Sequence, residues 1–162
     1  MVRPARARSI EEQLADEVAL YYADPLGFVL AMYPWGEAGT PLADEAGPDV
    51  WQAKFLRELG EEVRRNGFDG QRPVTPIRRV VSSGHGIGKS TLVAWLVDWI
   101  MSTRPHAQGT ITANTFTQLE TKTWAAIKRW TAFCLTSHWF KLNDNRMYHV
   151  DHKDSWFCAP AS

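Results

Sequence analysis

A glycine-rich stretch near the middle of the chain has the residue types of a phosphate-binding loop. It runs from Ser82 to Thr91 and reads Ser-Ser-Gly-His-Gly-Ile-Gly-Lys-Ser-Thr. Glycines let backbone N–H groups turn inward and come close to an anion. In such loops the lysine, here Lys89, reaches the β- and γ-phosphates, and the next hydroxyl, here Ser90, coordinates Mg²⁺. The stretch therefore predicts a site for ATP and Mg²⁺.

The stretch departs from the usual pattern at its first position. The pattern G-x-x-x-x-G-K-[ST] begins with glycine, and this chain has Ser83 there. Serine adopts a positive φ less readily than glycine, so we expect the loop to start with a different bend. A glycine-rich turn without a ligand is the alternative. The residues predicted to bind the nucleotide are Gly84, His85, Gly86, Ile87, Gly88, Lys89, Ser90 and Thr91.

The segments on either side are expected to hold this loop between a strand and a helix. Residues 77–81, Ile-Arg-Arg-Val-Val, have the composition of a strand, and the apolar run 92–101 that of a buried helix. The start of a helix adds unpaired N–H groups and the positive end of a dipole. Strand, glycine-rich turn and helix together form the context that a phosphate-binding loop requires.

The remaining segments predict helices before this unit and further strands after it. A capping box, Ser9 to Glu12, opens a first helix that places Ile10, Leu14 and Val18 on its inner face. The other predicted elements are helices at 26–32 and from about 49 to 63, a strand at 109–113, a helix at 117–134 opened by a capping box, and strands at 146–150 and 155–159. The order predicts an α/β fold with a parallel sheet, preceded by a helical N-terminal section.

Composition limits the classes of protein to consider. The chain has 162 residues and a formal net charge of +0, so no strongly basic surface indicates nucleic acid. Two cysteines, Cys134 and Cys158, form no disulfide framework and favour a reducing cytoplasm. The longest apolar run is too short to span a bilayer, and no secretory signal precedes the chain's helices. We therefore expect no membrane association.

Several blocks of the sequence resemble phage terminase large subunits. The lead-in of that family is similar to Asp-Pro-Leu-Gly-Phe-Val at 24–29, Tyr-Pro-Trp-Gly at 33–36 and Gly-Pro-Asp-Val-Trp-Gln at 47–52. Residues 83–91 resemble its nucleotide loop, and residues 102–105 and 112–124 resemble the stretch that follows. The resemblance covers nearly the whole chain. Trp51-Gln52 and the block 112–124 are more specific than the loop, which many NTPases share.

The resemblance implies the ATP-binding part of a DNA-packaging motor. In that family a RecA-like P-loop ATPase drives genomic DNA into an empty capsid, and a C-terminal nuclease cuts it. The implied division is a helical lead-in at 1–75 and the first part of the ATPase domain at 76–162. The implied partners are double-stranded phage DNA, the terminase small subunit, the capsid portal and further copies of the full-length protein, in the cytoplasm of the host cell.

The resemblance also implies roles for two further residues. Gln52 looks like the family's upstream glutamine motif, which contacts adenine, whereas a solvated helix residue is the alternative. His85 lies where some large terminases place an arginine that senses the γ-phosphate. A neutral imidazole cannot copy a guanidinium, so a side chain that points to solvent is the alternative for His85.

The family's catalytic acid has no counterpart in the sequence. Hydrolysis requires an acidic partner for Mg²⁺ and a group that orients water, and in this family both follow a later apolar strand. No such strand occurs before Ser162, and Asp151 and Asp154 have the pattern of turn residues. The strand at 77–81 would also lack its usual neighbours. We therefore expect a weakly stable chain with slow ATP hydrolysis, and an inactive nucleotide-binding fragment or a small P-loop kinase remain alternatives.

Other clusters of residues favour structural roles. His149, His152 and Cys158 fit no tight zinc spacing. Trp95 and Trp99 have the spacing of core residues. Four further tryptophans could stack on bases, although helical spacing favours core burial for the first two of them: Trp124, Trp130, Trp139 and Trp156. Basic side chains on the helix after the second strand are expected on a solvated face, with contact to DNA as a hypothesis from the family. They are Lys122, Lys128 and Arg129.

Overall fold

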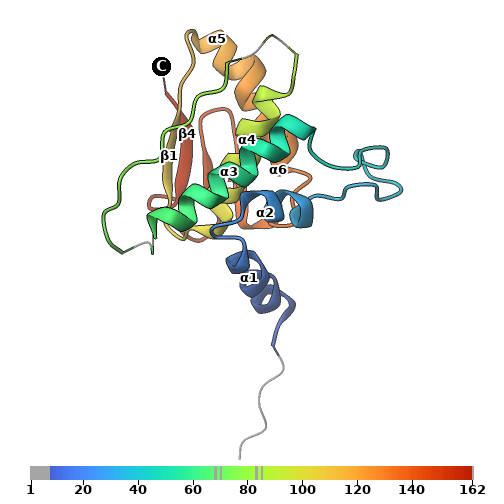
Figure 1. Cartoon of the computed structure of the whole chain (residues 1–162). Coiled ribbons are helices and arrows are strands. Elements are labelled where there is room, and N and C mark those ends of the chain that lie inside the picture. Colours follow the sequence, from blue (N-terminus) through green and yellow to red (C-terminus); the bar gives the residue numbers. More distant parts are fainter. Residues whose placement is uncertain (1–7, 68, 70, 83, 85, 162) are drawn as a thin grey trace, which may run out of the picture.

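Helix α4, Lys89–Thr103, lies at the centre of the molecule, between a layer of helices and a small sheet (Figure 1). The structure is a computed structural model that describes residues 8–67, 69, 71–82, 84 and 86–161. The side of α4 with Trp95 and Trp99 packs against the helical layer, and the side with Ala94 and Met101 packs against the sheet. A helix that is hydrophobic on two sides is buried, so α4 serves as the common core element.

Three helices from the N-terminal section cover one side of α4. They are α1, Ile10–Leu20, α2, Pro25–Met32, and α3, Val50–Asn66. The predicted capping box is confirmed, because the Glu12 N–H donates to Ser9 Oγ at 3.1 Å and the Ser9 N–H donates to Glu12 Oε2 at 2.8 Å. Gly67 ends α3 in a left-handed conformation, with φ of 58°.

The predicted inner face of α1 is only partly confirmed. Val18 is 1% exposed, but Ile10 is 82% exposed. Figure 1 shows the reason, since α1 projects from the body of the molecule and its first residues lie furthest out. Amphipathic spacing gives the side of a helix that faces a core but not how far along the helix that core extends.

The sheet has four short strands and is mixed. The strands are β1, Gln108–Ile111, β2, Phe140–Leu142, β3, Met147–His149, and β4, Phe157–Pro160, in the order β1-β4-β3-β2. β1 and β4 are parallel, whereas the other two pairs are antiparallel. The predicted strand near 109–113 and the C-terminal hairpin are therefore present. β2 was not predicted, and with the hairpin it makes the sheet mixed instead of parallel throughout.

The connection between β1 and β2 contains an unusual helix. α5, Phe116–Gln118, leads into the π-helix η1, Leu119–Trp124, and then into α6, Ala125–Thr131. The short 3₁₀-helix η2, Ser137–Trp139, precedes β2. The predicted capping box at Thr117 is wrong, because the Gln118 N–H donates to Thr115 Oγ1 at 3.2 Å and Thr117 lies inside the helix.

The predicted strand at 77–81 does not form. The segment has the alternation of a strand, since Ile77 and Val81 pack against the core while Val80 is 91% exposed. Among the described residues, however, none of the backbone groups of 76–82 has a backbone hydrogen-bond partner. The side chain of Arg79 holds the segment on α3 through Glu62 Oε2 at 2.6 Å and the carbonyl of Glu58 at 3.2 Å.

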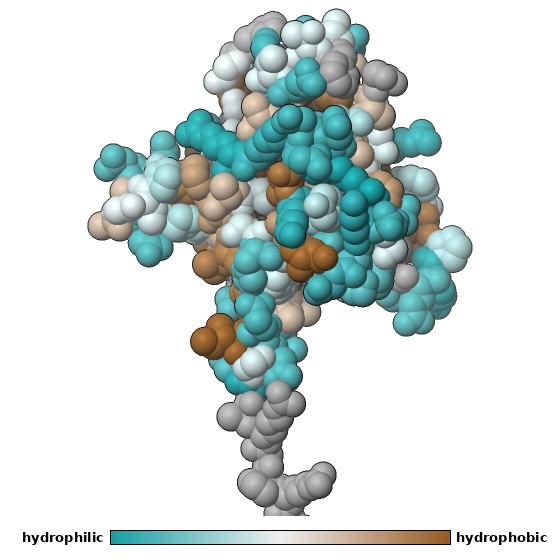
Figure 2. Space-filling view, turned by 180° about the vertical axis from the view of Figure 1, so that it is seen from behind, coloured by the Kyte–Doolittle hydropathy of each residue, from teal (hydrophilic) through white to brown (hydrophobic). Residues whose placement is uncertain are grey.

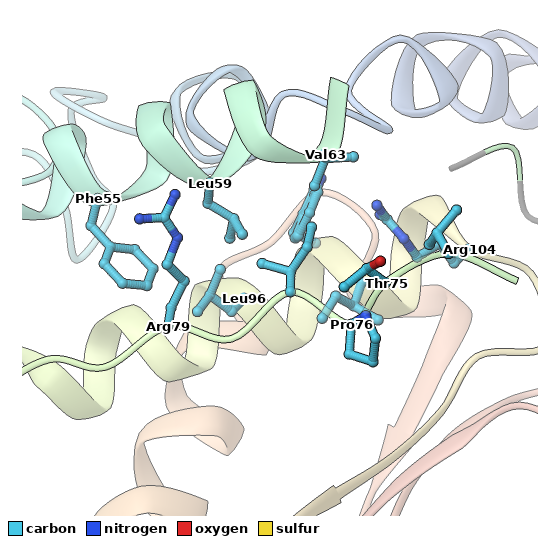
Figure 3. A pocket seen from close by; sticks show the side chains of 12 residues that line it. Phe55, Leu59, Val63, Thr75, Pro76, Arg79, Leu96 and Arg104 are labelled. Atoms are coloured by element: carbon cyan, nitrogen blue, oxygen red, sulfur yellow. The ribbon is translucent and has the colours of Figure 1, made fainter. Parts of the chain in front are cut away.

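This extended segment, α3 and α4 enclose an apolar cavity of about 360 Å³. Figure 3 shows Phe55, Leu59 and Val63 pointing from α3 towards Leu96 of α4 and the extended segment. The cavity lies beside the chain that leads into the glycine-rich loop. Its apolar side chains bury one side of this chain and thereby fix where the loop begins.

One face of the molecule is largely hydrophilic. The face in Figure 2 shows mostly hydrophilic residues, with small separated hydrophobic patches. Within the part of the chain that the structure describes, no helix has both the length and the apolar character needed to cross a membrane.

A candidate nucleotide-binding site at the start of α4

The glycine-rich loop enters α4 through two residues in left-handed conformations. Gly86 has φ of 79°, and Gly88, the N-cap of α4, has φ of 85°. Side chains other than glycine rarely adopt such angles, which explains the glycines at these two positions. Lys89 is the first helical residue, so the unpaired N–H groups of the first turn lie where the sequence predicted them.

Gln52 of α3 holds this loop. Its side-chain Oε1 accepts from the Asp49 N–H at 2.9 Å, and its Nε2 donates to the Gly88 carbonyl at 3.0 Å. Gln52 is only 4% exposed, and a Cβ on residue 88 would approach its Nε2 to 2.7 Å. The structure therefore places Gln52 beside the glycine-rich loop with both its amide atoms on the protein backbone, which excludes the alternative of a solvated helix residue. Its contact with adenine stays a prediction.

The side chain of Lys89 folds back over the loop. Its Nζ donates to the Gly84 carbonyl at 2.6 Å. The ammonium group thus lies above the segment that the glycines shape, held by a neutral oxygen. A phosphate oxygen is a stronger acceptor for an ammonium than a carbonyl, because the hydrogen bond is then assisted by two charges.

The two hydroxyls that follow Lys89 have different surroundings. Thr91 Oγ1 accepts from the indole N–H of Trp130 at 3.2 Å, so this hydroxyl helps to join α4 to α6. The half-buried Ser90 hydroxyl has no hydrogen-bond partner among the residues that the structure describes. Of the two hydroxyls, that of Ser90 is therefore the one available to a ligand, and its role as a ligand of Mg²⁺ stays a prediction.

A cavity of about 510 Å³ opens at the start of α4. One wall is the loop and first turn, from Gly86 to Thr91, and the other comes from Ala113 and from the helical segment after it. That second wall carries Gln118, Lys122 and Thr123, which the sequence did not assign to the site. Two lysines and no carboxylate stand among the described residues that line this cavity, so its charge favours an anion.

A second cavity, of about 260 Å³, lies on the other side of the loop and shares Gly86, Gly88 and Thr91 with the first. It is lined by the aromatic rings of Trp35, Trp95 and Trp130 and by polar side chains, among them Glu45, Asp49, Gln52 and Arg129. Flat rings with a few polar groups are suited to a planar heterocycle.

One buried donor in the second cavity lacks a protein partner. Trp95 is 2% exposed, and its indole N–H has no hydrogen-bond acceptor among the described residues. The neighbouring indoles are satisfied, since Trp35 donates to the Val29 carbonyl at 2.8 Å and Trp130 to Thr91. Buried donors without a partner are uncommon. The Trp95 nitrogen has almost no exposed surface, so its missing partner does not by itself mark a ligand site.

Asp98, in the middle of α4, belongs to a separate buried network. The Tyr33 hydroxyl donates to Asp98 Oδ2 at 2.5 Å, and the Thr131 hydroxyl donates to Oδ1 at 2.6 Å. Burial raises the pKa of Asp98 to about 7, although both hydrogen bonds act to lower it. Asp98 lines neither of the two cavities at the loop, and its bonds tie α2 and α6 to α4.

The histidines near the C-terminus surround a tryptophan. The ring of His149 stacks on Trp156 at a centroid distance of 4.2 Å, and the rings of His106 and His152 lie 4.9 Å apart. Cys158 is buried among apolar side chains. Within the described residues, no group of three His, Cys, Asp or Glu side chains has the arrangement of a metal site.

The remaining predicted residues divide between the site and the rest of the molecule. Arg129 lines the second cavity, and Lys128 forms an ion pair with Asp144. Trp95 and Trp99 are core residues, as predicted, and Trp156 is also buried. His85, the suggested γ-phosphate sensor, lies outside the described residues.

Comparison with known proteins adds no relative. No protein-family model, no curated protein and no solved structure matches the chain.

Proposed function

We propose that the chain binds ATP at the start of α4, as the nucleotide-binding part of a terminase-type motor. The triphosphate would occupy the cavity with two lysines, and the base would occupy the cavity with the tryptophans. The observation that carries this proposal is the loop itself. Gly86 and Gly88 are left-handed, Lys89 lies over them, and both cavities meet at these residues.

The charges of the first cavity suit a polyphosphate. Lys89 and Lys122 line it, together with the first turn of α4, whose N–H groups and dipole favour an anion. On binding, Lys89 would exchange the carbonyl of Gly84 for phosphate oxygens. The exchange replaces a hydrogen bond to a neutral acceptor by one between opposite charges.

The same residues offer a single protein ligand for Mg²⁺. The Ser90 hydroxyl has no other partner in the described part of the chain and lines the triphosphate cavity. Mg²⁺ would neutralise phosphate charge there, and it usually takes one or two carboxylates in addition to the phosphates. No carboxylate stands among the described lining residues, so we propose nucleotide binding with slow hydrolysis.

The assignment to DNA packaging rests on the sequence. The blocks around Trp51-Gln52 and at 112–124 resemble terminase large subunits, and both lie against the proposed site. In that reading the chain contributes ATP binding to the translocation of phage DNA into a capsid. The small subunit, the portal and further copies would then be its partners. The alternative is that the chain binds the nucleotide but does not hydrolyse it.

Isothermal titration calorimetry with ATP and Mg²⁺ tests the proposal. We expect Lys89→Ala to weaken ATP binding by about 100-fold, since it removes a charge-assisted contact worth about 2.7 kcal/mol. Lys141→Ala is the matched control, because Lys141 is exposed on β2 and lines neither cavity. A wild-type chain without measurable ATP binding, or a Lys89→Ala variant with unchanged affinity, would contradict the proposal.

A further inference from the structure

The wall of the triphosphate cavity opposite the glycine-rich loop carries a second cation. Lys122 belongs to η1 and lines the cavity together with Gln118 and Thr123, while Lys89 lines it from α4. The two lysines are 33 positions apart in the sequence, so only the fold brings them to one cavity. No pattern in the sequence joins Lys122 to the loop.

Lys122 has no partner in the protein that would explain its position. Among the described residues it forms neither an ion pair nor a side-chain hydrogen bond. Lys54 pairs with Glu58 at 3.9 Å and Lys128 pairs with Asp144, whereas the exposed Lys141 is unpaired within the described residues, as Lys122 is. What sets Lys122 apart is its place in the wall of the cavity. The ammonium of Lys122 is therefore available, and it lines a cavity in which no carboxylate is described.

The π-helical turn explains how three side chains reach one cavity. A π-helix closes its hydrogen bonds between residues i and i+5, so residues four and five positions apart lie on the same side. Gln118, Lys122 and Thr123 have this spacing, and all three line the cavity. Single π-helical turns are frequent at functional sites, where they direct side chains that a regular α-helix would separate.

Two ammonium groups that share a cavity repel each other unless an anion lies between them. Lys122 is exposed, so water screens its charge in the empty protein, and a ligand with several negative charges would attract both lysines. A triphosphate carries its extra charge at the end remote from the base. Since Lys122 lines the wall opposite the loop, its contact would be to the phosphates that ATP has and AMP lacks.

We propose that Lys122 binds the terminal phosphates of the nucleotide and makes the site selective for a triphosphate over a monophosphate. This role rests on the proposed function of the site, and it replaces contact with DNA as the explanation for Lys122. Lys89 of α4 and Lys122 of η1 would then contact the phosphates from opposite walls of the cavity.

Titration of ATP, ADP and AMP against three variants tests this role. We expect Lys122→Ala to weaken ATP binding about tenfold, as loss of one charge-assisted hydrogen bond does, and to leave AMP binding within about twofold. Lys122→Arg should retain most of the ATP affinity because it keeps the charge. Lys141→Ala is the control for loss of an exposed lysine, and circular dichroism of each variant checks that it is folded.

Each outcome decides a different claim. Unchanged ATP affinity in a folded Lys122→Ala variant, beside a large loss in Lys89→Ala, overturns this role and leaves the proposed function standing. An equal loss for ATP and AMP also overturns it, because Lys122 would then support the fold of the site. A loss of binding to a fluorescent DNA duplex without a loss for ATP assigns Lys122 to DNA instead. Absence of ATP binding by the wild-type chain overturns both proposals.

Discussion

The middle and the start of α4 both have polar groups beside them, but the two sets differ in whether the protein provides their hydrogen-bond partners. In its middle, Asp98 is 1% exposed, and hydroxyls of Tyr33 and Thr131 occupy both of its oxygens. At its start, Ser90 and the opposite Lys122 line a cavity and have no side-chain partner in the described protein. The polar groups of the first region are satisfied within the protein, whereas those of the second are available to a ligand or to solvent.

This difference separates polar groups that hold the fold together from those that a ligand can reach. A buried carboxyl that is fully hydrogen-bonded fixes the packing of the helices around it. Hydroxyl and ammonium groups that line a cavity without partners contribute little to folding and remain available to a ligand. We therefore expect changes in the middle of α4 to alter the stability of the fold. Changes at its start should alter the affinity for a ligand.

The largest effect is expected from the ionisation of Asp98. Its pKa of about 7 lies above the ordinary value of 3.8, so the folded state favours the neutral carboxylic acid. The contribution of this protonation to the free energy of unfolding is fully present below pH 4, and it is lost as the pH rises to 7. At about 1.36 kcal/mol for each pKa unit, the loss amounts to about 4 kcal/mol. Urea unfolding at several pH values measures it.

Asp98→Asn is the variant that isolates this effect, because the amide is neutral at every pH and has nearly the same shape. We expect its stability to stay flat where that of the wild type falls. Asp144→Asn is a control of opposite sign, since the hydrogen bond from Lys128 lowers the pKa of the exposed Asp144. The wild-type stability should fall between pH 4 and 7 when it is compared with that of Asp98→Asn. If it does not fall, Asp98 makes no such contribution to stability, and the contrast between the two regions of α4 fails.

The next largest effect is expected at Gln52, which joins α3 to the start of α4. Gln52→Leu leaves the Asp49 N–H and the Gly88 carbonyl without their partners, so we expect a loss of about 2 kcal/mol in the free energy of unfolding. Gln13→Leu is the matched control, because Gln13 is exposed on α1 and donates only to the Arg8 carbonyl at 3.2 Å.

The same variant separates support of the loop from recognition of the base. If Gln52 only holds Gly88, Gln52→Leu weakens ATP and GTP binding by the same factor. A larger loss for ATP than for GTP would show that its remaining hydrogen-bonding capacity reads adenine. Equal stability of Gln52→Leu and the wild type would contradict the structural role.

The smallest effect is expected at Ser90. Ser90→Ala should weaken ATP binding about fivefold with Mg²⁺ present and should have no effect in EDTA, because only the metal contact is removed. Thr91→Val is the comparison, since the Thr91 hydroxyl is already bound to Trp130. An Mg²⁺-independent loss in Ser90→Ala would indicate that this hydroxyl supports the fold, as that of Thr91 does.

Sequence patterns located most of the elements and one wall of the site. The start of α1, the helices α2, α3 and α4, and the strands β1, β3 and β4 follow from local signals such as the capping box at Ser9. The glycine-rich loop was also predictable, because positive φ angles at Gly86 and Gly88 require glycine wherever they occur. These signals lie within a few residues of the features that they specify.

Features that depend on distant parts of the chain were not predictable. The position of Lys122 in the cavity requires both the path of the chain after β1 and the π-helical turn. The network of Asp98 joins Tyr33 to Thr131, nearly one hundred residues further along. Residues 77–81 have the pattern of a strand, but a pattern cannot provide the neighbouring strand that a ladder of hydrogen bonds needs.

The extended segment before the loop has a consequence for local stability. Its backbone amides 77–82 face no acceptor in the described chain, whereas those of α4, a few residues later, belong to the buried core. Amide hydrogens of the segment should therefore exchange with deuterated water almost as fast as in a peptide, and those in the centre of α4 only on global unfolding. The chain can thus rearrange on one side of the site while the other side stays fixed.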